Sequence, residues 1–192
     1  RQIYNPSLDY SVYLSQPFFF VLFQVLILLT TVYTVGIEIK FRTATDWLAT
    51  AKGNMITAVW GKLLPYTFIY ILIGWLGNYV MFGILHIPFQ GSWWLINMIT
   101  VLFVIATQAL GLFIFSLFPA VSLVISVVSM VGSLGATLSG VTFPVSNMYP
   151  LVRDASYLFP VRHFTEMIQT MLYGGGGFIY LWPSMVILCI FP

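Results

Sequence analysis

Charged side chains are scarce in this chain of 192 residues. Seven basic and five acidic residues make up only 6% of it, whereas soluble domains carry about 25%. So few charges could not cover the surface of a soluble globule, and we therefore expect no soluble fold. The net charge of +2 is also too small for a nucleic-acid partner.

Cysteine and the usual catalytic patterns are scarce as well. The single cysteine, Cys189, allows no disulfide within the chain, and its apolar surroundings predict a small buried side chain. His86 and His163 stand apart from any pattern of metal ligands, so we expect both to be structural. The apolar runs hold no Gly-x-Ser-x-Gly, no His-Glu-x-x-His and no pair of carboxylates, which argues against an intramembrane enzyme.

Long apolar runs are what the chain does have. Hydrophobic residues make up 60% of it, and its mean hydropathy is +0.98. A helix needs about 20 apolar residues to cross a hydrocarbon core of about 30 Å. Charged stretches and breaks rich in glycine and proline divide the runs, so we predict an all-α integral membrane protein with about five transmembrane helices in this part of the chain. The predicted spans are 17–37, 60–84, 93–118, 120–143 and 178–192.

The most hydrophilic stretch, residues 38–62, predicts a cytoplasmic loop with a short helix. It holds six charges, and four of them are basic, which places the loop in the cytoplasm by the positive-inside rule. Apolar residues recur at spacings of three and four, which predicts an amphipathic helix over 39–52 that ends at Gly53–Asn54. The apolar positions are Phe41, Ala44, Trp47, Leu48 and Ala51. The helix either rests on the membrane surface or docks on a partner, and the pattern alone leaves both open.

Residues 144–173 mix prolines and charges with apolar positions. This composition predicts two short extracellular helices that lie at the interface or dip into the protein, rather than another span. Arg162 and Glu166 are four residues apart on the second helix, so we expect them to form an ion pair.

Several segments, in order along nearly the whole chain, resemble the permeases of type-2 ABC transporters. They are residues 36–50 and 61–66 around the predicted loop, and then 139–144, 148–150, 158–160 and 173–175. The loop departs from the family pattern at Phe41 or Arg42, where a second acidic residue is expected. It departs again at Ala44–Thr45 and Thr50–Ala51.

The resemblance implies the membrane subunit of an ATP-driven exporter in the inner membrane, which is no enzyme itself. It implies a cytoplasmic ATPase subunit as partner and a homodimer or heterodimer of permeases. The full chain would have six spans, with one span and an extracellular domain before Arg1. The helix at 39–52 would be the coupling helix, which docks on the ATPase through Glu38, Lys40, Arg42, Thr45, Asp46, Trp47 and Leu48. An extracellular gate would include Phe143, Pro144, Pro150 and Pro160, although a rigid cap without substrate contact is the competing interpretation.

ATP and magnesium would then be bound by the partner and not by this chain. The sequence lacks a Gly-x-x-x-x-Gly-Lys-(Ser/Thr) loop, because Gly61–Lys62 has neither the upstream glycine nor the following hydroxyl residue. A secondary transporter or a channel is the alternative function. Residues 63–152 contain no Lys, Arg, Asp or Glu, which argues against ion coupling but leaves a passive channel open. The sequence does not choose a substrate.

Overall fold

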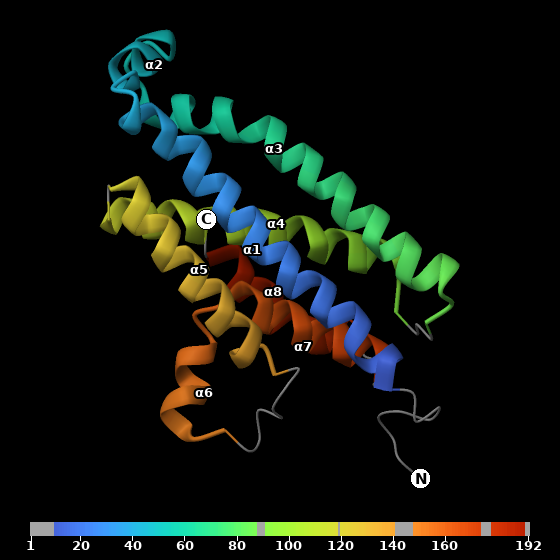
Figure 1. Ribbon diagram of the computed structural model, residues 1–192. Coiled ribbons are helices and arrows are strands. Elements are labelled where there is room, and N and C mark those ends of the chain that lie inside the picture. Colours follow the sequence, from blue (N-terminus) through green and yellow to red (C-terminus); the bar gives the residue numbers. More distant parts are fainter. Residues whose placement is uncertain (1–9, 88–90, 119, 141–147, 174–177, 191–192) are drawn as a thin grey trace.

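The computed structural model describes residues 10–87, 91–118, 120–140, 148–173 and 178–190, and every regular element in these ranges is a helix. Four are long: α1 (Tyr10–Lys40), α3 (Met55–Asn78), α4 (Trp93–Leu117) and α5 (Val121–Leu138). α3 continues directly into the π-helix η1 (Tyr79–Ile84). The shorter helices are α2 (Ala44–Thr50), α6 (Pro150–Ser156), α7 (Pro160–Tyr173) and α8 (Phe178–Ile190). Figure 1 shows α2 at one end of the bundle and α6 at the other.

The predicted all-α class is confirmed by the helices of the described part, and four of these are long and apolar enough to cross a bilayer. They overlap the predicted spans 17–37, 60–84, 93–118 and 120–143, which remain predictions of where the chain crosses. The helix in the predicted span 120–143 is α5, and it ends at Leu138, before the predicted end of that span. α8 covers 13 residues of the predicted span 178–192 and is too short to cross alone, so the fifth crossing stays a prediction.

Helix α1 is the centre of the bundle, because α3, α4, α5 and α7 all contact it. Its closest neighbour is α5, whose glycines let the two backbones approach. A Cβ atom added at Gly132 would lie 2.7 Å from Val25, and one at Gly135 would lie 2.9 Å from the Gln24 amide. Small residues at such contacts are what holds helices together in a bilayer, where hydrophobic burial gives no preference for protein over lipid.

Helix α7 lies inside the protein, which decides between the two predicted positions of the extracellular hairpin. Three phenylalanines from different helices, Phe20 of α1, Phe103 of α4 and Phe164 of α7, are fully buried against one another. Their ring centroids are 4.1 Å apart for Phe20 and Phe164, 4.7 Å for Phe103 and Phe164, and 5.8 Å for Phe20 and Phe103. The hairpin therefore dips into the bundle through α7, whereas most of α6 is exposed.

The first turn of α7 is held by a side chain from the middle of α1. The first N–H groups of a helix have no partner within it, and here the backbone N–H of Val161 donates to Gln24 Oε1 at 2.9 Å. Gln24 lies close to the middle of α1, which runs from Tyr10 to Lys40. Helix α7 thus begins beside the middle of α1, and Gln24 supplies an acceptor for its first turn.

Cys189 is exposed on α8, so its predicted burial is wrong for this chain. In a membrane protein an apolar side chain needs no protein cover, because lipid solvates it equally well. An apolar run therefore predicts membrane depth but not which face is buried.

We predict that Gln24→Leu lowers the free energy of unfolding by about 1–3 kcal/mol, because it leaves the buried Val161 N–H without an acceptor. Thermal unfolding of the purified full-length protein in detergent measures this. The matched control is Thr31→Val on the same helix, whose hydroxyl donates only to the Ile27 carbonyl of its own helix. Equal melting temperatures for the two variants would contradict the proposed role of Gln24.

Candidate functional site

The link between α1 and α2 is a tight turn rather than continuous helix. α1 runs to Lys40, and Arg42 adopts a left-handed backbone conformation (φ 59°). The N–H of Thr43 donates to the Glu38 carbonyl at 2.9 Å, and the N–H of Arg42 donates to the Ile39 carbonyl at 3.2 Å. These two bonds form a Schellman motif, in which an arginine takes the place usually held by glycine.

The predicted coupling helix at 39–52 is therefore wrong in its bounds. Residues 39 and 40 belong to α1, and α2 has seven residues, about two turns. The apolar spacing misled because Phe41 precedes the turn while Ala44 and Trp47 follow it. The spacing of apolar residues does not reveal a turn when the residues on its two sides keep the helical spacing.

Helix α2 ends in a second turn of the same kind. Lys52 (φ 54°) and Gly53 (φ 77°) are both left-handed, and the Gly53 N–H donates to the Leu48 carbonyl at 3.0 Å. Asn54, predicted as part of this cap, instead begins α3, where its side-chain oxygen accepts from Ile56 N at 3.0 Å and Thr57 N at 3.3 Å. Two backbone reversals thus set α2 as a corner between two spans.

Side chains fasten this corner to both spans. Glu38 at the end of α1 forms an ion pair with Lys62 of α3, and the Thr43 hydroxyl donates to the other carboxylate oxygen. The Lys62 ammonium also lies 5.2 Å from the centroid of the Trp47 ring of α2. The side chains of Lys62 and Glu38 are only 21% and 19% exposed, so water screens their attraction incompletely. We call Glu38, Thr43, Trp47 and Lys62 the corner clamp.

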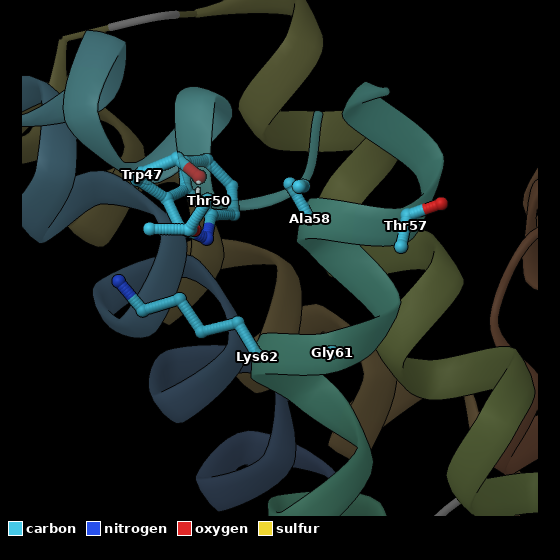
Figure 2. Close-up of a pocket in the computed structure, with 7 residues that line it drawn as sticks. Trp47, Thr50, Thr57, Ala58, Gly61 and Lys62 are labelled. Atoms are coloured by element: carbon cyan, nitrogen blue, oxygen red, sulfur yellow. Dashed lines mark hydrogen bonds between the residues drawn. The ribbon is translucent and has the colours of Figure 1, made fainter. Parts of the chain in front are cut away.

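An open hollow of about 410 Å³ lies between α2 and α3, behind the clamp. Figure 2 shows Trp47 and Thr50 on the α2 side, with Ala58, Gly61 and Lys62 on α3. A Cβ atom added at Gly61 would meet nothing within 4 Å. The corner is therefore fastened at the clamp and loosely packed beside it.

The seven predicted docking residues fall into two groups. Four are exposed at the tip of the corner, namely Lys40, Arg42, Thr45 and Asp46. The other three, Glu38, Trp47 and Leu48, are partly buried and lie toward the spans. Sequence reasoning left Thr43 and Lys62 out of the site. No local pattern could reveal Lys62 as the partner of Glu38, since 24 residues separate them.

The predicted gate residues are described only in part. Phe143 and Pro144 lie outside the described residues. Pro150 and Pro160 occupy the first positions of α6 and α7, where proline costs no hydrogen bond. Pro160 is buried and Pro150 is exposed, so the two do not share an environment.

The predicted pair of Arg162 and Glu166 is confirmed, with 3.8 Å between Nη2 and Oε2. His163 is buried, and its Nε2 lies 3.0 Å from the Tyr157 carbonyl oxygen. Among the described residues no cluster of His, Cys, Asp and Glu could hold a metal ion.

Comparison with known proteins points to membrane transport. A family model described as ABC-2 family transporter protein matches residues 1–192. The inner membrane transport permease YhhJ of Escherichia coli (strain K12) is 30% identical over 109 residues, which are 55% of this chain and 28% of that permease. The probable multidrug ABC transporter permease YbhS of the same strain is 29% identical over 118 residues, 59% of this chain and 30% of the relative. The matched part thus spans less than a third of either relative, and no solved structure matches the chain.

The corner clamp predicts that Lys62→Glu destabilises the protein by about 1 kcal/mol or more, because it places two carboxylates together in a half-buried site. The double variant Glu38→Lys with Lys62→Glu should recover part of that loss by restoring opposite charges. Thermal unfolding of the full-length protein measures both. Lys40→Glu, an exposed change two residues from Glu38, is the control and should have little effect. Absence of any recovery in the double variant would mean that the pair does not hold the corner.

Proposed function

This chain belongs to the ABC-2 family of transporter proteins, and from that membership we propose that it is the membrane-spanning permease of an ATP-driven exporter in the inner membrane. The observation that carries the proposal is the α2 corner, an exposed tip clamped to the ends of two spans. Such a corner suits the transfer of force from a cytoplasmic ATPase to the membrane.

The tip offers the partner a compact polar surface. Arg42, Thr45 and Asp46 are exposed there, and α2 has no buried residue of its own among those described. A push on this tip would reach α1 through Glu38 and α3 through Lys62, since both belong to the corner clamp. α1 would pass the displacement to the whole bundle, because it contacts α4, α5 and α7 as well.

The motor in this proposal is a separate subunit. The 192 residues contain no phosphate-binding loop, so ATP and magnesium would be held by the partner ATPase. The chain would supply the path and the mechanical connection, and the partner would supply the free energy.

A row of hydroxyl groups on α5 supports a path along that helix. Each of its members is exposed, and the row runs the length of the span as Ser122, Ser126, Ser129, Ser133 and Thr137. The hydroxyls of Ser126, Ser129, Ser133 and Thr137 each donate to a carbonyl one turn back in α5, so these members of the row cost little even beside lipid. We infer that this face meets the cargo or the second permease of a dimer, and that α6 and α7 border its outer end.

We predict that a cysteine at Thr45 can be crosslinked to the partner ATPase in the co-purified complex, because Thr45 is exposed at the tip of the corner. The background variant is Cys189→Ser, which removes the chain's one native thiol. The control is a cysteine at Leu151 of α6, which is 74% exposed but lies at the opposite end of the bundle. Labelling of Thr45→Cys by membrane probes, with no crosslink, would favour a surface helix and a channel or carrier instead.

A second prediction concerns the hollow behind the corner. Gly61→Phe should fill it and limit the movement of α2, so that less cargo is transported per ATP hydrolysed while the ATPase still binds. Transport and ATP hydrolysis are measured together in proteoliposomes. Leu64→Phe is the matched control, since Leu64 is 58% exposed, one turn along α3, and does not line the hollow. An unchanged ratio in Gly61→Phe would show that coupling does not use this space.

A further inference from the structure

A second cavity lies between α3 and α4, on the half of the bundle nearer α2. Its volume is about 110 Å³, and its walls are largely apolar, with contributions from Trp60, Leu63, Ile105, Ala109 and Leu112. It is separate from the corner clamp, since Trp47 and Lys62 do not line it. Trp60 is 54% exposed at its rim, in the manner of tryptophans at a membrane interface.

One hydrogen-bond donor in this cavity has no partner. Gln108 of α4 is 6% exposed, and its Oε1 accepts a hydrogen bond from the Thr67 hydroxyl of α3 at 2.8 Å. That bond leaves the Nε2 amide group as the free end, and Nε2 finds no acceptor among the described residues. A buried donor without a partner is costly, so such groups in folded proteins are normally satisfied by protein, water or a ligand.

A single trapped water is a poor solution for this amide. A buried water typically makes about three hydrogen bonds, but besides Gln108 and Thr67 the described lining offers only the indole N–H of Trp60, whose side chain is half exposed at the rim. A ligand with a hydrogen-bond acceptor on an apolar chain would satisfy the Gln108 Nε2 donor and also fill the apolar cavity. The cavity is also smaller than the roughly 150 Å³ that holds a benzene molecule, so it admits one segment of a chain rather than a bulky ring system.

The depth of the donor matches that of an acyl ester. Thr67 lies five residues beyond Lys62 on α3, which is about 7.5 Å along the helix. The interfacial region on each side of the hydrocarbon core is about 5–8 Å thick. With Lys62 and Trp60 at the level of the headgroups, the Gln108 amide lies at the inner edge of that region, where the ester carbonyls of phospholipids are found.

We infer that this cavity is a binding site for one phospholipid of the leaflet on the α2 side. The Nε2 of Gln108 donates to an acyl ester carbonyl, and the first segment of that acyl chain fills the space between α3 and α4. The bound lipid seals the seam between these two helices. The site depends on the membrane location of the chain and not on the ATPase partner.

The test is native mass spectrometry of the full-length protein with two competing lipids, diacyl phosphatidylethanolamine and its dialkyl ether analogue without ester carbonyls. The wild-type protein should retain the ester lipid about two- to tenfold over the ether lipid, the range for one hydrogen bond. Gln108→Leu should remove that preference. Thr107→Val is the matched control, because its hydroxyl donates to the Phe103 carbonyl of its own helix and it does not line the cavity.

A second variant keeps the test decisive if Gln108→Leu folds poorly. Ala109→Phe leaves Gln108 and Thr67 in place but fills the cavity, so it should lower retention of both lipids and abolish the ester preference. Equal retention of ester and ether lipids by the wild-type protein would overturn the proposal. Unchanged retention and preference in Ala109→Phe would overturn it as well.

Discussion

Inside a bilayer the first turn of a helix must find partners for its backbone N–H groups within the protein, and Gln24 supplies one for α7. This single hydrogen bond explains how a helix that does not span the membrane can begin halfway along α1. Nearby, Phe164 of α7 packs against Phe20 of α1 and Phe103 of α4. Without the acceptor the same phenylalanines would draw an unsatisfied backbone into the core. The polar contact permits the burial, and the close packing of the three rings stabilises it.

At the opposite end of α1 the side chains around α2 are largely exposed, and tight turns rather than a buried acceptor end the helices. Left-handed residues at Arg42 and Lys52 end two helices within a dozen residues and fold α2 back against the spans. Non-glycine residues in this conformation cost roughly 1–3 kcal/mol each and persist only where their surroundings enforce them. At Arg42 the corner clamp of Glu38, Thr43, Trp47 and Lys62 holds the turn in place, because Glu38 and Thr43 flank it. The result is a short lever joined to two spans, with a hollow beside it.

Between the two ends, the few polar side chains within the spans occupy particular places. Asn78 donates to Thr100 at 2.9 Å and joins α3 to α4 at the end away from α2. Gln108 and Thr67 join the same two helices nearer α2, and the Nε2 group of Gln108 has no acceptor among the described residues. The hydroxyl row of α5, by contrast, is exposed, and Ser126, Ser129 and Ser133 donate to carbonyls of their own helix. Polar groups in this bundle thus serve to join helices, to meet a ligand, or to face a path.

The sequence by itself determined the class, most of the spans and the family. Charge scarcity and apolar length depend only on the cost of placing groups in hydrocarbon, which is a property of each residue, and the ordered motifs around residues 36–66 and 139–175 led to the family that the comparison confirms. Only the tertiary structure decided where the α2 helix begins, that α7 is buried, and that Cys189 is not. These depend on contacts between distant residues, such as Glu38 with Lys62 and Gln24 with Val161. Lipid and protein interior are equally apolar, so hydropathy cannot distinguish the face of a helix that meets lipid from the face that meets another helix.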